Sequence, residues 1–198
     1  MKNKSYICLL LVFLFKPAFS SELNILYMVN AIGSCDIVFN PTKELRLPPL
    51  DPLDIIDSPN PRVLSIGKVN LKLTNCANNY SRTPYLTISG TTSTDNIDVT
   101  TRPFLLKSSG QSKGFGFVIG KSSSGIIEWG EGSNGIYSFA SGNVSIVLGR
   151  QGMPASELNN LSKDLYVGIT CGTAKGCQSQ NVNSGDLNAN LVFNFSYN

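Results

Sequence analysis

The chain has 198 residues, of which 41% are hydrophobic and 15% charged, with 16 basic and 13 acidic side chains and no histidine. This near balance of charge gives no electrostatic basis for binding nucleic acid or an anionic membrane surface. The absence of histidine excludes every catalytic triad that uses an imidazole as its base.

The first twenty residues are typical of an export signal. Lys2 and Lys4 precede an apolar run from Tyr6 to Phe15, and small residues lead to an expected cleavage before Ser21. The run is too short to span a bilayer, and no longer apolar run follows it. We therefore expect an exported protein without membrane insertion, whose mature part of about 178 residues forms one domain.

The segment 21–34, "SELNILYMVNAIGS", contains the first predicted strand, over residues 23–31. Apolar residues recur there at every second position, which is typical of a strand with one buried face. The set is Leu23, Ile25, Tyr27, Val29 and Ala31. On this pattern alone, the segment is either the first strand of its own domain or a strand offered to another one.

Four cysteines follow the signal: Cys35, Cys76, Cys171 and Cys177. An even number in an exported chain indicates two disulfides, for which three pairings exist. The simplest pairing joins sequence neighbours, 35 with 76 and 171 with 177. The C-x5-C spacing of the last two, without any histidine, matches no common zinc pattern. We therefore expect no metal and no cofactor.

The middle of the chain shows short alternating segments separated by glycine, serine, asparagine and proline. Many short strands with regular turns are typical of a β-sandwich or barrel. Further strands are predicted at residues 35–39, 63–74, 85–89, 96–100, 103–107, 115–119, 126–129, 143–148, 165–171 and 187–197. Five prolines within 45–62 predict a long loop or a kinked edge. A helical turn is expected near Ser156, which could cap it.

Three motifs in this region suggest chemistry and are better explained as turns. "GQSKG" at 110–114 fits a nucleophile elbow in letters, but the chain has no histidine to act as base. "GKS" at 120–122 lacks the first glycine of a phosphate loop, because Phe115 stands there. In "EWGEG", Glu128 and Glu131 flank Trp129, an arrangement that could serve glycosidase chemistry or bind a sugar. We favour a buried tryptophan followed by a turn, and expect no enzyme.

The last fourteen residues, "GDLNANLVFNFSYN", contain the clearest strand of the chain. Apolar and polar residues alternate with a single exception, Val192. The apolar set comprises Leu187, Ala189, Leu191, Phe193, Phe195 and Tyr197. A terminal strand is stable only if neighbours cover its apolar face and pair its backbone, so this one needs partners on both sides.

This ending resembles that of fimbrial subunits assembled by the chaperone–usher pathway. Those chains commonly carry a glycine fourteenth from the C-terminus and a penultimate tyrosine, and Gly185 and Tyr197 stand at these positions. "SCDIVF" around Cys35, "VNLKLTNC" ending at Cys76, and the export signal resemble the first disulfide of that family and its strands. The likeness covers both ends of the mature chain.

The resemblance implies an all-β fold, an incomplete immunoglobulin-like sandwich that lacks its seventh strand. It divides the chain into a signal peptide at 1–20, an N-terminal extension and candidate donor strand at 21–34, and a pilin domain at 35–198. A periplasmic chaperone would supply the missing strand first, docking on the C-terminal strand and anchoring the carboxylate of Asn198. After delivery to an outer-membrane usher, the donor strand of another subunit would replace it.

The function implied is that of a structural subunit of an adhesive fimbria on the cell surface, exported through the periplasm and polymerised by donor-strand exchange with identical or different subunits. A second hypothesis of a different class is a self-contained secreted β-sandwich that binds a carbohydrate, with Trp129 as its platform. The two hypotheses differ in whether the purified protein needs a partner strand to stay soluble.

Overall fold

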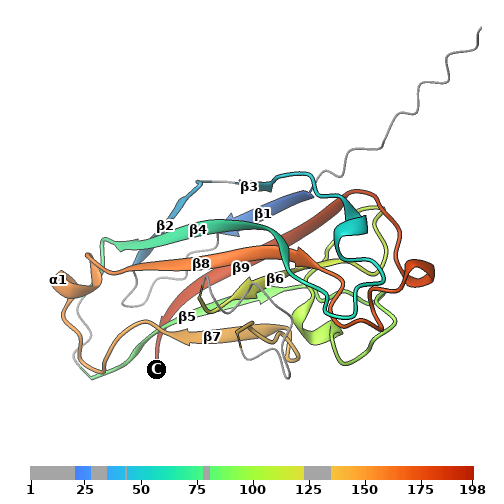
Figure 1. The fold of residues 1–198 in the computed structure, drawn as a ribbon. Coiled ribbons are helices and arrows are strands. Elements are labelled where there is room, and N and C mark those ends of the chain that lie inside the picture. Colours follow the sequence, from blue (N-terminus) through green and yellow to red (C-terminus); the bar gives the residue numbers. More distant parts are fainter. Residues whose placement is uncertain (1–20, 28–34, 43, 78–80, 123–134) are drawn as a thin grey trace, which may run out of the picture.

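A computed structural model describes residues 21–27, 35–42, 44–77, 81–122 and 135–198, the first of these ranges by its backbone. Two β-sheets lie face to face and form a sandwich (Figure 1). One sheet has the strand order β3-β1-β9-β5-β7 and the other β2-β4-β8-β6. The strands are β1 Ser21–Tyr27, β2 Asp36–Asn40, β3 Glu44–Leu47, β4 Leu64–Thr74, β5 Pro84–Gly90, β6 Gly116–Gly120, β7 Asn143–Val147, β8 Ser162–Thr170 and β9 Leu187–Tyr197. The predicted all-β sandwich is confirmed.

Helical structure is confined to single turns in the described part of the chain: η1 Pro52–Asp54, η2 Arg102–Phe104, α1 Ala155–Leu158 and η5 Ser179–Asn181. The helical turn expected near residue 156 is α1. Its cap is not Ser156, because Pro154 holds the N-cap position and no side chain caps the turn. No helix among the described residues is long and apolar enough to cross a membrane.

The core lies between the sheets and is built from the alternating apolar residues of their strands. Leu71 and Leu73 of β4 and Leu86 and Ile88 of β5 are fully buried there. The rings of Phe39 and Phe193 meet across the core, with their centroids 4.7 Å apart. Burying a side chain of this size contributes about 1.5–3 kcal/mol relative to leaving it exposed, so the facing strands hold the two sheets together.

Three loops gather at the end of the sandwich opposite the C-terminus (Figure 1). They connect β3 to β4, β5 to β6 and β8 to β9. Cross-links join them: the backbone N–H of Asp57 donates to the carbonyl of Cys177 at 2.9 Å, and the amide of Asn96 donates to the carbonyl of Cys171 at 2.9 Å. This end is therefore closed by loops that are fixed to one another.

The prediction of strands at 96–100 and 103–107 is wrong. Residues 96–101 form a loop around the fully buried side chain of Asn96, and η2 follows it. The Asn96 amide nitrogen donates to the carbonyl of Gly114 at 2.6 Å, and its oxygen accepts from the backbone N–H of Asp98 at 2.8 Å. The alternation in this segment arises because the polar side chains point inward to satisfy the loop backbone, while Ile97 and Val99 are exposed.

Asp98 in this loop and Asp95 just before it are held in their charged form. Burial alone would raise the pKa of Asp98, but hydrogen bonds from Thr173 and Thr100 outweigh it and lower the pKa below the ordinary value of 3.8. Burial also opposes the charge of Asp95, whose pKa is nevertheless lowered by its hydrogen bonds with Lys107 and Ser93. A lowered folded-state pKa stabilises the fold above pH 3.8, and this stabilisation is lost as the pH falls through the folded value.

Two cysteine pairs lie at disulfide distance. Cys35 and Cys76 have their sulfur atoms 2.06 Å apart, and Cys171 and Cys177 have theirs 2.02 Å apart. These are the simplest pairs expected from the sequence. The first joins the start of β2 to the end of β4, and the second closes a short loop after β8.

Replacing Asn96 by Ala should lower the free energy of unfolding by about 2–4 kcal/mol, because the carbonyls of Gly114 and Cys171 would lose their buried donor. Urea denaturation measures this. The control is Asn183→Ala, which removes an exposed amide and should change stability by about 0.5 kcal/mol or less. Equal effects of the two substitutions would show that the Asn96 hydrogen bonds do not hold the loop.

Loss of the first disulfide should destabilise the protein more than loss of the second. The cysteines are 41 residues apart in the first pair and 6 in the second. The chain-entropy model gives about 4 and about 2 kcal/mol for loops of these lengths. Denaturation of the two double variants, Cys35→Ala with Cys76→Ala and Cys171→Ala with Cys177→Ala, tests the order. The reverse order would contradict the loop-length argument.

Candidate functional site

The N-terminal strand β1 lies between β3 and β9 and joins them into one sheet. It runs antiparallel to β3, with Leu23 opposite Leu45, and parallel to β9, with Ser21 opposite Leu187. Neighbouring strands are about 4.8 Å apart, so β3 and β9 stand roughly 10 Å from each other across β1. If β1 left this position, an open groove with two unpaired strand edges would remain.

The register of β1 against β9 matches the apolar pattern of both segments. Positions 23, 25 and 27 of β1 are opposite Ala189, Leu191 and Phe193 of β9. These three residues of β9 are at most 2% exposed and belong to the core. The predicted apolar set of the N-terminal segment is therefore in register with the buried set of β9 at Leu23, Ile25 and Tyr27. Val29 and Ala31 lie outside the described residues.

The C-terminal strand β9 begins and ends where the sequence predicts, at Leu187 and Tyr197. Its apolar set is buried with one exception, since Phe195 is only partly buried and packs edge-on against Tyr197 with ring centroids 5.0 Å apart. Asn190, on the opposite face, is exposed. The strand thus has one apolar and one polar face.

Gly185 precedes β9 at a position that excludes a side chain. Its φ angle is 153°, and a Cβ atom there would lie 2.7 Å from the backbone nitrogen of Ser112. The turn that leads into β9 therefore requires glycine for a local steric reason.

The end of the chain is tied into the domain by hydrogen bonds. Asn198 and Thr83 exchange two backbone hydrogen bonds, of 2.8 and 3.0 Å. The hydroxyl of Tyr197 donates to the carbonyl of Ala77 at 2.9 Å, and burial raises the pKa of this hydroxyl. β5 pairs with residues 191–197 of β9, whereas the described pairing with β1 ends at Phe193. Over residues 194–197, the β1 side of β9 has no strand partner among the described residues.

Other sequence-predicted sites are not brought together by the described structure. Ser112 of the "GQSKG" segment is buried, and its hydroxyl has no hydrogen-bond partner among the described residues, so no base stands beside it. No group of three or more Cys, Asp or Glu residues in the described ranges could hold a metal ion. Glu128, Trp129 and Glu131 lie outside the described residues, as does the strand predicted at 126–129.

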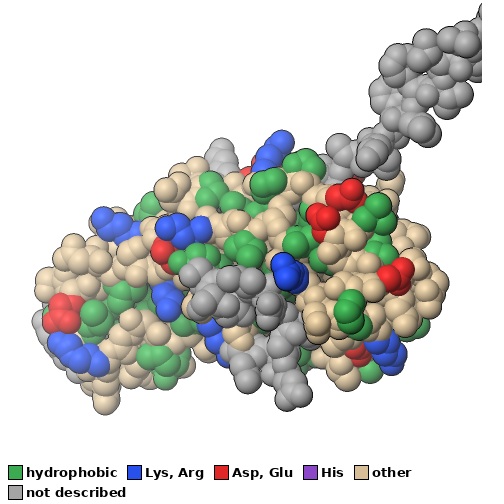
Figure 2. All heavy atoms as spheres, in the orientation of Figure 1, with side chains coloured by type: hydrophobic (Ala, Val, Ile, Leu, Met, Phe, Trp, Pro, Cys, Tyr) green, Lys and Arg blue, Asp and Glu red, His purple; other side chains and the backbone are tan. Residues whose placement is uncertain are grey.

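Charge does not single out a binding surface on the face that Figure 2 shows. Acidic and basic side chains are interspersed there, and no stripe of one sign follows a strand or a loop. The groove around β1 is instead defined by its backbone edges and by the apolar face of β9.

Sequence reasoning missed one element of the site, the strand β3. Leu45 and Leu47 are buried and Arg46 is exposed, which is the alternation of a strand. The prolines of 45–62, which include Pro48 and Pro49, predicted a long loop or a kinked edge, and β3 is indeed at the edge of its sheet and ends just before Pro48. The signal was present, but four residues are too few to stand out beside such a segment.

No protein-family model and no curated protein matches this sequence.

A charge placed on the apolar face of β9 should unfold the domain. Phe193→Asp would put a carboxylate where the buried Phe193 ring now packs against Phe39, and an unpaired buried charge is far more costly than a solvated one. Asn190→Asp is the matched control, because this side chain is exposed on the other face of the same strand. Circular dichroism and urea denaturation should show an unfolded first variant and a control within about 0.5 kcal/mol of the parent.

Proposed function

We propose that the protein is a structural subunit of an adhesive fimbria, an immunoglobulin-like sandwich whose last strand is supplied by another polypeptide. It is exported through the periplasm, where a chaperone fills the groove, and an outer-membrane usher then joins the subunits by donor-strand exchange. The observation that carries the proposal is the position of β1: a segment at the very start of the mature chain fills the slot between β3 and β9.

A strand in this position is exchangeable because of its connectivity. β1 precedes every other strand and helix among the described residues, so it can leave the sheet without threading a loop through the fold. The fourteen residues of the 21–34 segment span at most about 50 Å when extended, which is enough to reach the groove of an adjacent domain of this size. The same segment can thus complete its own sheet or that of a neighbour.

The groove needs an occupant at every stage. Without one, Leu191 and Phe193 would lose the strand that lies beside them, and β3 and β9 would both present unpaired edges. Exposed apolar faces and open strand edges promote aggregation. A chaperone that lends a strand before assembly, and a subunit that donates one afterwards, both meet this need by strand addition.

The direction of β1 favours its replacement. It pairs in parallel with seven residues of β9 and antiparallel with four residues of β3. A strand entering in the opposite direction would pair antiparallel with β9, the longer edge, and parallel pairing is slightly less stable per residue. An incoming strand of reversed direction therefore gains on the long edge more than it loses on the short one.

The test is a deletion of residues 21–31 followed by addition of a synthetic peptide with the sequence of residues 21–34. The deletion variant should be aggregation-prone or strongly destabilised alone, and the peptide should bind it and restore its thermal stability. A peptide with Ile25→Asp should fail, because position 25 is opposite buried Leu191. A peptide with Asn24→Asp should work like the parent, because position 24 is opposite exposed Asn190.

Two results would overturn the proposal. If the deletion variant is soluble and as stable as the parent, the groove does not need a strand. If the variant is unfolded and no peptide restores it, β1 is a fixed first strand of a self-contained domain.

A further inference from the structure

The strand β7 forms one edge of the larger sheet (Figure 1). It pairs antiparallel with β5, with Val144 opposite Ile88 and Ile146 opposite Leu86. No strand in the described part of the chain pairs with its outer side. Because β9 and β5 separate β7 from β1, this edge is independent of the groove between β3 and β9.

The hydrogen bonds at both ends of β7 show which of its backbone groups point outward. The N–H of Leu148 donates to the carbonyl of Pro84 at 3.0 Å, and the carbonyl of Gly142 accepts from the N–H of Gly90 at 3.3 Å. In an antiparallel pair, residues that bond the neighbouring strand alternate with residues that do not. The even-numbered positions of 142–148 therefore face β5, and the N–H and C=O groups of the odd-numbered positions point away from the sheet.

The other three sheet edges in the described structure are protected against pairing. On β3, Arg46 and Glu44 form an ion pair of 2.9 Å, and two prolines follow the strand. β2 begins with Asp36 and ends directly before Pro41. The outer side of β6 is already hydrogen-bonded by loop residues. Charged side chains, prolines and covering segments are the usual means by which proteins block an edge.

The strand β7 has none of these protections. It contains neither a charged residue nor a proline, and the first charge after it is Arg150. Val147 is 58% exposed although it is apolar. The neighbouring strands β5 and β9 also contain no charged residue. An uncharged edge strand rich in β-branched residues is a template for pairing with another strand.

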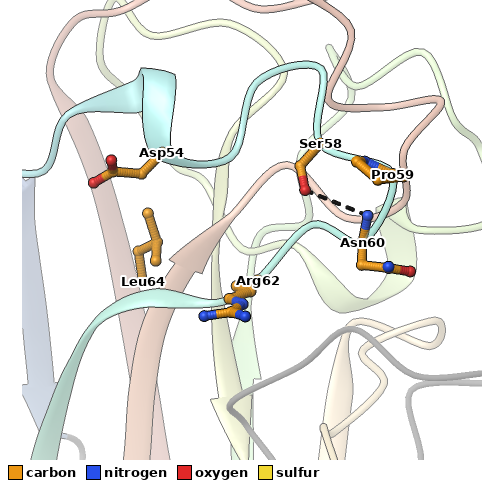
Figure 3. A pocket seen from close by; sticks show the side chains of 6 residues that line it. All are labelled: Asp54, Ser58, Pro59, Asn60, Arg62 and Leu64. Atoms are coloured by element: carbon orange, nitrogen blue, oxygen red, sulfur yellow. Dashed lines mark hydrogen bonds between the residues drawn. The ribbon is translucent and has the colours of Figure 1, made fainter.

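The hollow between η1 and the start of β4 differs from this edge. Its polar side chains include Asp54, Asn60 and Arg62, which are exposed (Figure 3). Water satisfies exposed polar groups of this kind, so the hollow selects no ligand. The outward groups of β7 form a regular row instead, and such a row matches one type of partner, an extended strand.

The sequence of β7 is complementary to itself. In an antiparallel pair of two copies with a two-fold axis at Ser145, Asn143 of each copy lies opposite Val147 of the other, and the outward backbone groups meet. Val144 then lies opposite Ile146 on the face that packs against the core, which brings two β-branched side chains together. We infer that β7 is a self-association site, through which two copies of the chain join their larger sheets into one. This inference does not rest on strand exchange.

A covalent trap tests the register. The two copies of residue 145 face each other as a hydrogen-bonded pair, whose Cα atoms are about 5.5 Å apart, within disulfide range. Under mild oxidation, Ser145→Cys should form a disulfide-linked dimer that is visible on a non-reducing gel. Thr87→Cys is the matched control, because Thr87 is opposite Ser145 within one copy and therefore lies one strand further from the edge. Equal cross-linking of the two variants would overturn the inference.

Charge at the axis tests the dimer without a covalent bond. Sedimentation of the mature chain should show a monomer that becomes a dimer as its concentration rises. Ser145→Lys and Ser145→Glu should each weaken the dimer several-fold, because like charges then meet, and a mixture of the two variants should restore it. Val38→Lys is the control, since Val38 is 48% exposed on the edge strand β2 of the other sheet, and it should dimerise like the parent.

Two results of this experiment would overturn the inference. The first is a parent chain that stays monomeric at every concentration. The second is a series of masses that continues beyond two copies and is unchanged by Ser145→Lys. A pairing about a two-fold axis closes at two copies, whereas strand exchange joins copies in an open series. The second result would therefore exclude self-association through β7 and leave the proposed function standing.

Discussion

The edge of β9 that is turned toward β3 is paired only if a strand lies between β9 and β3. Ala189, Leu191 and Phe193 belong to the core, yet the edge of β9 beside them is paired by β1 and by no other described strand. The backbone pairing of this edge is thus met by one segment of seven residues. The integrity of the larger sheet depends on that segment, because β3 contacts β9 only through it.

This constraint joins the first and the last of the described strands. Among the described strands β1 comes first and β9 last, so their pairing closes a longer loop than that of β5 with β9, although the entropic cost of closure rises only slowly with loop length. The pairs β4 with β8 and β5 with β9 are closer in sequence and need no help from β1. If β1 left the sheet, a sandwich with an open groove between β3 and β9 would remain. In that state the groove is available to any strand with the same alternation, which is the physical basis for the proposed exchange.

Alternation predicted the strands that pack against the core and failed where another cause produced the same pattern. β9 and β4 were predicted within a residue because their apolar faces are long and regular. Residues 96–100 alternate as well, but there Asn96 and Asp98 point inward and accept hydrogen bonds from the backbone of their own loop. The sequence pattern alone does not distinguish such a loop from a strand. The strands that pair with β1 could not be predicted from the sequence for a related reason. A half-buried strand has the same sequence pattern whether its neighbours belong to its own chain or to another.

The long loop between β3 and β4 is held in place by hydrogen bonds that do not involve β1. Asp57 bonds the β8–β9 loop at Cys177 and Ser179, and Ile55 is buried in the core. Exchange of β1 for the strand of a neighbour changes the edges of β3 and β9 but leaves those anchors in place.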